Sequence, residues 1–164
     1  EKGLDVLIEA MSKLQDIDLH LILIGTGHDD YVAALKQKIA DGGLTGRVSF
    51  AGFRNPVLPC LGSCDFGLLP SIVREGYPLS PMEYMSQGRC VIATDNGGQK
   101  EYLTSGDNAL LVKPGDADML ADAIRRLATD KALRDKLSTK AYADFSQKMS
   151  YNKFIERIEE AYEH

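Results

Sequence analysis

The feature of this sequence that most limits its fold is a regular alternation of short apolar segments with amphipathic ones. The first apolar segment, residues 19–24, is almost continuously apolar and ends in Gly25-Thr26-Gly27. Such a segment is typical of a strand buried on both faces of a parallel sheet. Four more segments have the composition and length of strands, at residues 48–51, 66–69, 90–93 and 109–112. The pattern predicts an α/β fold, a Rossmann-like doubly wound parallel sheet with helices on both faces.

Helical periodicity fills most of the sequence around these strands. Residues 3–14 place Leu4, Leu7, Ile8, Met11 and Leu14 on one helical face. Further helices are expected at 30–40, 81–87 and 117–127, with short helices or turns at 55–61 and 99–103. Beyond Thr129 the sequence predicts only helices, at 132–145 and 151–162. We therefore expect a Rossmann-like domain over residues 1–150 and a C-terminal helix over 151–164, with its apolar face partly exposed.

Length and charge narrow the possible functions. The 164 residues suffice for one compact domain, and the net charge of −5 gives no global positive field to attract nucleic acid. No apolar run approaches the length of a membrane span. The three cysteines, Cys60, Cys64 and Cys90, form no CxxC pair, which indicates buried thiols in a reducing compartment. A soluble, cytoplasmic protein is expected.

The predicted topology places three unusual loops together. Segments that leave parallel strands at their carboxyl ends emerge on one edge of the sheet, where open α/β sheets bind ligands. Residues 25–27, 70–78 and 95–98 all follow expected strands. These loops hold glycines and polar residues that periodicity does not explain. The sequence therefore predicts a binding crevice lined by the three loops.

The segment from Glu75 to Glu83 is the most informative part of this crevice. It places one carboxylate in a loop and another in the first turn of a helix, near backbone N–H groups that can bind phosphate. Two carboxylates can also accept hydrogen bonds from sugar hydroxyls. A structural alternative exists for Glu83, because residues 80–83 match a capping box with Ser80 at N-cap. Glu75 lies outside the helix and has no such explanation.

Four blocks of sequence resemble the carboxyl-terminal domain of retaining glycosyltransferases of family 4, which have the B-type glycosyltransferase fold. Their order and spacing match the family along nearly the whole chain. The blocks are residues 1–10 with Lys2-Gly3; Leu23-Ile24-Gly25-Thr26-Gly27; Pro70-Ser71 with Glu75, Glu83 and residues 88–94; and Gly97-Gly98 with Glu101 and residues 113–116.

The resemblance implies a role for each matching residue. It implies that Glu75 contacts the donor sugar, that Glu83 contacts the ribose, and that Lys2 neutralises the donor diphosphate with an upstream arginine outside this sequence. The remaining expected donor contacts are Gly25, Gly27, Phe53, Arg54, Gly76, Tyr77, Pro78, Leu79, Gly97 and Gly98, with Glu101 as a further candidate. The glycines would let the backbone approach the ligand closely.

Some residues depart from the family pattern or invite other readings. Tyr77-Pro78 replaces the usual Phe-Gly, which removes one N–H donor near the ligand and leaves that of Leu79. Cys90 replaces the usual proline. The acidic triplets at 16–18 and 116–118 look like turn and helix-start residues, not metal ligands. His20 is expected as a satisfied strand histidine, and His28 as a crevice residue with a possible contact to ligand.

The resemblance implies a retaining, metal-independent transfer of a sugar from a nucleoside diphosphate sugar to a glycan or lipid-linked acceptor. The acceptor would be bound by an N-terminal domain outside this sequence, onto which residues 151–164 would pack. Any association with a membrane would also come through that domain. The 164 residues alone are expected to bind the donor weakly and to transfer nothing. The alternatives are a non-catalytic nucleotide-binding or interaction domain, and a nucleotide-sugar epimerase relative, which would lack the paired glutamates.

Overall fold

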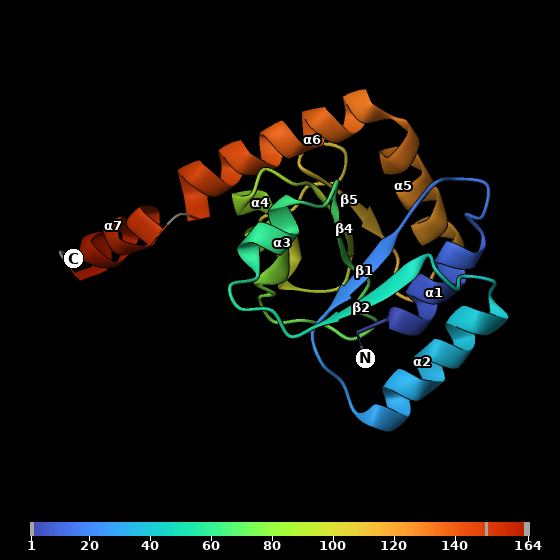
Figure 1. Cartoon of the computed structure of the whole chain (residues 1–164). Coiled ribbons are helices and arrows are strands. Elements are labelled where there is room, and N and C mark those ends of the chain that lie inside the picture. Colours follow the sequence, from blue (N-terminus) through green and yellow to red (C-terminus); the bar gives the residue numbers. More distant parts are fainter. Residues whose placement is uncertain (1, 150, 163–164) are drawn as a thin grey trace.

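The computed structural model of this chain describes residues 2–149 and 151–162, in which strands and helices alternate as the sequence predicts (Figure 1). The strands are β1 Leu21–Ile24, β2 Val48–Gly52, β3 Gly67–Leu69, β4 Val91–Thr94 and β5 Ala109–Val112. The helices are α1 Leu4–Ser12, α2 Asp29–Asp41, α3 Leu58–Gly62, α4 Ser80–Ser86, η1 Gly98–Glu101, α5 Ala117–Thr129, α6 Lys131–Asp144, η2 Phe145–Met149 and α7 Tyr151–Tyr162. The fold is the expected Rossmann-like α/β fold with a helical tail.

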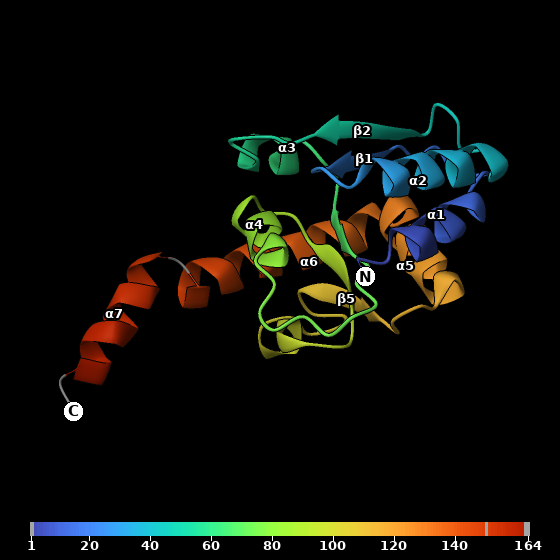
Figure 2. The ribbon, with the colours of Figure 1, turned by 90° about the horizontal axis from the view of Figure 1, so that it is seen from below.

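All paired strands are parallel, but their hydrogen bonds define two sheets instead of the expected single one. One sheet pairs β1 with β2, and the other has the order β3-β4-β5. Figure 2 shows β1 and β2 together, apart from β5. A cavity of about 550 Å³ lies between β1 and β3, lined on one side by residues 19–24 and on the other by Phe66, Leu68 and Pro70. We call it the intersheet cavity; it separates the two strands that a continuous sheet would join.

The burial of the strands follows from this arrangement. The expectation that the first strand is buried on both faces is wrong, because Ile22 is 44% exposed and Phe50 on the neighbouring β2 is 38% exposed. Leu21 and Leu23 pack into an apolar cluster on one face of β1, whereas Ile22, which points to the opposite face, does not. The pattern instead describes β4, whose four residues are all buried between β3 and β5.

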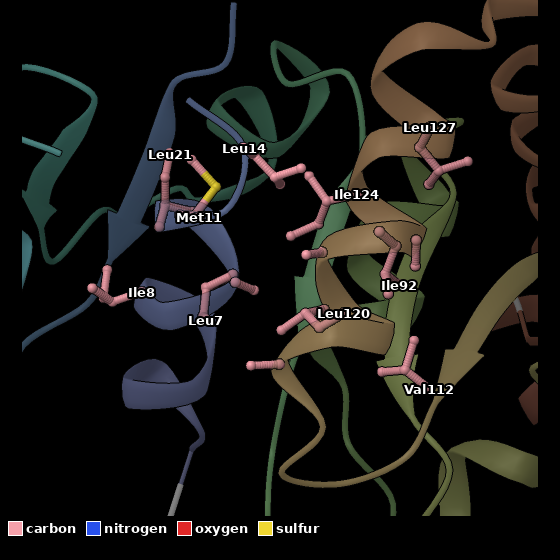
Figure 3. Packing of buried hydrophobic residues seen from close by; sticks show 14 of the residues in the cluster. Leu7, Ile8, Met11, Leu14, Leu21, Ile92, Val112, Leu120, Ile124 and Leu127 are labelled. Atoms are coloured by element: carbon pink, nitrogen blue, oxygen red, sulfur yellow. The ribbon is translucent and has the colours of Figure 1, made fainter. Parts of the chain in front are cut away.

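Two apolar clusters show that helices cover both faces of the β3-β4-β5 sheet. The larger one packs α1 and α5 against the strands, with Leu7, Met11, Leu120 and Ile124 at its centre (Figure 3). The smaller one packs α4 and α6 on the other side, around Met85. The double winding predicted from the sequence is therefore present.

The tail leaves the body of the domain. In Figures 1 and 2, α6 runs along the domain and α7 extends away from it. On α7, Ile158 is 38% exposed and Tyr162 is 88% exposed, as expected for a helix with an uncovered apolar face. Phe154 lies four residues before Ile158, a spacing that predicts the same helical face, but its side chain is outside the described part of the structure. Among the helices that the structure describes, none is long and apolar enough to cross a membrane.

Candidate functional site

Lys2 and Glu75 form the centre of the candidate site. The Lys2 ammonium lies 2.7 Å from Glu75 Oε1, and the Ser71 hydroxyl donates to the same oxygen at 2.5 Å. The Glu75 side chain is 17% exposed, whereas that of Lys2 is 67% exposed. The hydrogen bonds from Lys2 and then Ser71 lower the pKa of Glu75, and partial burial opposes them only in part. Glu75 is therefore a carboxylate at neutral pH, with its second oxygen left to accept hydrogen bonds.

The glycine after Lys2 explains how two distant segments meet. Gly3 is buried and has a φ of +72°, a left-handed conformation that favours glycine. A Cβ atom at Gly3 would lie 1.8 Å from the carbonyl oxygen of Pro70. Only glycine allows this contact, which brings Lys2 beside the loop that carries Glu75.

The loop that follows β3 is tied to the segment after β4. The Thr94 hydroxyl donates to the Ser71 carbonyl at 2.7 Å, and the Asn96 amide donates to the carbonyls of Ser71 and Val73 at 3.1 and 3.0 Å. Gly98 N–H donates to the Glu75 carbonyl at 3.0 Å. Three of the expected crevice residues, Glu75, Gly76 and Gly98, thus lie together. They follow the carboxyl ends of the neighbouring parallel strands β3 and β4, as the topology predicts.

Gly97 and Gly98 have a steric role in this contact. A Cβ at Gly97 would lie 2.4 Å from the Glu75 carbonyl oxygen, and one at Gly98 would lie 1.7 Å from the Gly76 carbonyl oxygen. Neither position has room for a side chain. These glycines are therefore required for the backbone of the Glu75 loop to pack against η1.

Glu83 lies apart from Glu75, in the first turns of α4. Helix α4 begins at Ser80 with Leu79 at N-cap, and no side chain caps it. The alternative of a capping box is therefore wrong, because Ser80 is already helical and the N–H of Glu83 donates to the Leu79 carbonyl. The Glu83 carboxylate has no hydrogen-bond partner among the described residues, and it lines the intersheet cavity. It is consequently free to accept a hydrogen bond from a ligand.

Four of the expected donor contacts, Gly25, Gly27, Phe53 and Arg54, lie at the ends of β1 and β2. Gly25 N–H donates to the Gly52 carbonyl at 2.9 Å, which places residues 25–27 beside Phe53 and Arg54. Phe53 is 70% exposed, and the exposed Arg54 donates only to the Phe53 carbonyl within the described structure. No hydrogen bond among the described residues joins residues 25–27, Phe53 or Arg54 to Glu75. The candidate site therefore has two ends, one at Glu75 and the other at residues 25–27 and 53–54. Glu83 and Ile24 both line the intersheet cavity.

Tyr77, Leu79 and Glu101 line a different cavity. It has a volume of about 650 Å³ and lies between the start of α4, residues 101–108 and the end of α6. We call it the tyrosine pocket, because Tyr77 and Tyr102 both line it with ring centroids 5.2 Å apart. Glu101 thus lies on the Tyr77 side of the loop, and no contact joins it to Glu75 among the described residues. Pro78, which departs from the family pattern, is buried, and its carbonyl accepts a hydrogen bond from Tyr102 at 2.5 Å.

Sequence reasoning missed several residues that shape this site. Ser71, Thr94, Asn96 and Tyr102 all contact the loop around Glu75 through hydrogen bonds. Of these, Ser71 and Thr94 lie in the sequence blocks that carry the resemblance, but their contacts depend on tertiary structure. The positions of Ser71, Thr94 and Asn96 shortly after expected strands could have suggested a role for them, whereas nothing in the sequence points to Tyr102.

The three cysteines are buried or partly buried, and the two histidines with described positions, His20 and His28, are exposed. Cys90 is buried, but Cys60 and Cys64 are only partly so, which corrects the expectation of three buried thiols. Burial raises the pKa of both Cys64 and Cys90, so neither favours a thiolate. His20 precedes β1, is exposed and pairs with Ser49 at 2.8 Å. His28 is exposed at the N-cap of α2.

Three of the four aspartates in the acidic triplets make structural contacts. Asp16 is held by Arg125 through both of its oxygens, at 2.6 and 2.9 Å. Asp116 is the N-cap of α5, as predicted, and accepts from Met119 N–H at 2.8 Å. Asp118 pairs with Lys13. No cluster of three or more potential metal ligands occurs among the residues with described positions.

Known glycosyltransferases resemble this chain in sequence. Residues 1–130 match the family model described as glycosyl transferases group 1. The lipopolysaccharide core biosynthesis glycosyltransferase LpsE of Rhizobium meliloti is 32% identical over 86% of this chain and 40% of its own length. The amylovoran biosynthesis glycosyltransferase AmsK of Erwinia amylovora is also 32% identical, over 97% of this chain and 42% of its own. The chain thus spans less than half the length of these relatives.

Solved structures have the same fold. The Anabaena protein Alr3699/HepE, crystallised with UDP, superposes with a TM-score of 0.92 at 30% identity, over 99% of this chain and 45% of that one. Its complex with UDP-glucose gives a TM-score of 0.90. The C-terminal domain of the group 1 glycosyl transferase LpcC from Francisella tularensis superposes with a TM-score of 0.83 at 28% identity, over 92% of this chain and 80% of that one.

Proposed function

This chain belongs to the group 1 glycosyl transferase family, and we propose that it forms the donor-binding half of a glycosyltransferase that uses a nucleoside diphosphate sugar. The observation that carries the proposal is the Lys2–Glu75 pair, a cation and a partly buried carboxylate held 2.7 Å apart at the edge of the sheet. The relatives give support: the Anabaena protein HepE was crystallised with UDP and with UDP-glucose. The assignment to family 4 within the group remains a prediction from the sequence.

We assign the two ends of the site to the two ends of the donor. Gly25, Gly27, Phe53 and Arg54 would hold the base, and Glu83 would accept hydrogen bonds from the ribose hydroxyls. Glu75 would accept hydrogen bonds from the sugar, through the oxygen that Lys2 and Ser71 leave free. This division fits a nucleoside diphosphate sugar, which has a nucleobase at one end and a sugar at the other.

Lys2 would stabilise the diphosphate. When the bond between the anomeric carbon and the phosphate oxygen breaks, negative charge develops on the diphosphate, and a nearby cation offsets it. An ammonium group has three N–H donors, so Lys2 can contact Glu75 and a phosphate oxygen together. We propose that this charge stabilisation requires no metal ion and that the anomeric configuration is retained.

The acceptor would come from a partner domain. The relatives are about twice as long as this chain, and we propose that an N-terminal domain binds the acceptor and that α7 packs onto it. The exposed Ile158 and Tyr162 on α7 support such a contact. The free thiols fit a cytoplasmic location.

Calorimetric titration of the chain with UDP, GDP and ADP tests the proposal. One nucleotide should bind equally in magnesium and in EDTA, and Glu83→Ala should weaken it about tenfold, because hydrogen bonds to charged groups are among the stronger ones. Glu159→Ala, on the exposed surface of α7, is the matched control and should bind as the unchanged chain does. Absence of nucleotide binding by the folded chain would instead favour a non-catalytic domain, and a magnesium requirement would refute metal independence.

A further inference from the structure

The loop that carries Glu75 also contacts Tyr102, a residue outside the four sequence blocks that carry the resemblance. Tyr102 follows η1 and is 8% exposed. Its hydroxyl donates to the Pro78 carbonyl at 2.5 Å, and its ring packs at a tilt of 57° against the ring of Tyr77. Tyr102 therefore contacts the two residues immediately before Leu79.

Tyr102 is itself fixed by the protein interior. The buried Asn108 side chain donates to the Tyr102 carbonyl at 2.9 Å and to Asp144 Oδ2 at 3.0 Å. Asp144, which is 3% exposed at the end of α6, also binds Lys140 and Lys148 at 2.8 and 2.9 Å. Burial raises the pKa of Asp144, but these hydrogen bonds lower it to about 2. A continuous hydrogen-bonded path therefore runs from the end of α6 to the loop.

In this path the hydroxyl of Tyr102 serves as the hydrogen-bond donor to the loop. Burial raises the pKa of Tyr102, so the hydroxyl stays protonated and can donate to Pro78. The other contacts of the loop lie elsewhere: Lys2 and Ser71 hold the Glu75 carboxylate, and Gly97 and Gly98 pack against its backbone. Tyr102 alone among the described residues donates to the Pro78 carbonyl.

We propose that Tyr102 is a positioning residue for the sugar part of the donor, because it fixes the backbone of residues 77 and 78 beside Glu75. The inference rests on the proposed function of the site. Among the described residues, Tyr102 forms no hydrogen bond or ring contact with the base-end residues or with Glu83, so its effect should depend on the sugar. This property separates positioning from a general loss of stability.

The test uses Tyr102→Phe, which removes only the hydroxyl, with Tyr142→Phe as the matched control because Tyr142 is 53% exposed and distant in sequence from the site. Calorimetry compares UDP-glucose with UDP, or GDP-mannose with GDP if the unchanged chain binds guanosine nucleotides. Tyr102→Phe should weaken the nucleotide sugar about three- to tenfold and change the nucleotide less than twofold. The control should change neither affinity.

Other outcomes would overturn the inference in distinguishable ways. Equal weakening of UDP and UDP-glucose, or no weakening of either, would show that Tyr102 does not position the sugar. Failure of the unchanged chain to bind any of these ligands would refute the proposed function and this inference with it. If circular dichroism shows that Tyr102→Phe does not fold, Tyr77→Leu removes the ring contact from its half-exposed side and should reproduce the selective loss for UDP-glucose; equal effects on both ligands would again contradict it.

Discussion

At the scale of single residues, the contact between Lys2 and Glu75 joins positions that are 73 residues apart in the sequence. The resemblance to known glycosyltransferases implied a role for each of them. Their direct ion pair, and the hydrogen bond from Ser71, could not be predicted, because both depend on the approach of Gly3 to Pro70. Composition and periodicity carry no information about such contacts.

Lys2→Ala should raise the pKa of Glu75 toward its usual value. The hydrogen bond from Lys2 is the largest influence that lowers it, while the one from Ser71 would remain. Because the folded-state pKa is depressed, the stabilisation that this pair gives is present above the unfolded-state pKa and lost as the pH falls through the folded one. Carboxyl ¹³C NMR titration measures the shift, with Lys36→Ala as a control on α2. An unchanged Glu75 pKa in Lys2→Ala would contradict the observed pairing.

At the scale of elements, most helices and strands begin and end within a few residues of their predicted positions. The errors have local causes. The start of α4 fits a capping box in sequence, yet Leu79 occupies the N-cap. The exposure of β1 could not be predicted either, since an apolar run does not reveal whether other elements will cover both of its faces. Pairing between strands is decided by the whole chain.

Gly98→Ala should destabilise the fold, whereas Gly76→Ala should be tolerated. A Cβ at Gly98 would lie 1.7 Å from the Gly76 carbonyl oxygen, but one at Gly76 meets nothing within 4 Å. The clash should cost about 1–3 kcal/mol of unfolding free energy, while the partner substitution should remain within about 0.5 kcal/mol. Urea unfolding compares the two variants. Equal stabilities would show that the loops can separate without cost.

At the scale of the whole molecule, the parallel topology predicted the location of the site better than its shape. Loops after β1, β3 and β4 were expected on one edge, and the residues after β3 and β4 do meet there. The residues after β1 pair instead with the end of β2, and the intersheet cavity lies between the two groups. A nucleotide sugar that spans the intersheet cavity would contact both ends of the site.

The measurement that tests this arrangement most directly is amide chemical-shift mapping of the chain with UDP and with UDP-glucose. Both ligands should shift the amides of Gly25 and Gly27, and only UDP-glucose should further shift those of Gly76 and Gly97. Shifts confined to the tyrosine pocket, for example at Thr104 and Asn108, would contradict the proposed site. So would identical shift patterns for the two ligands, because they would show that the sugar does not reach the loop around Glu75.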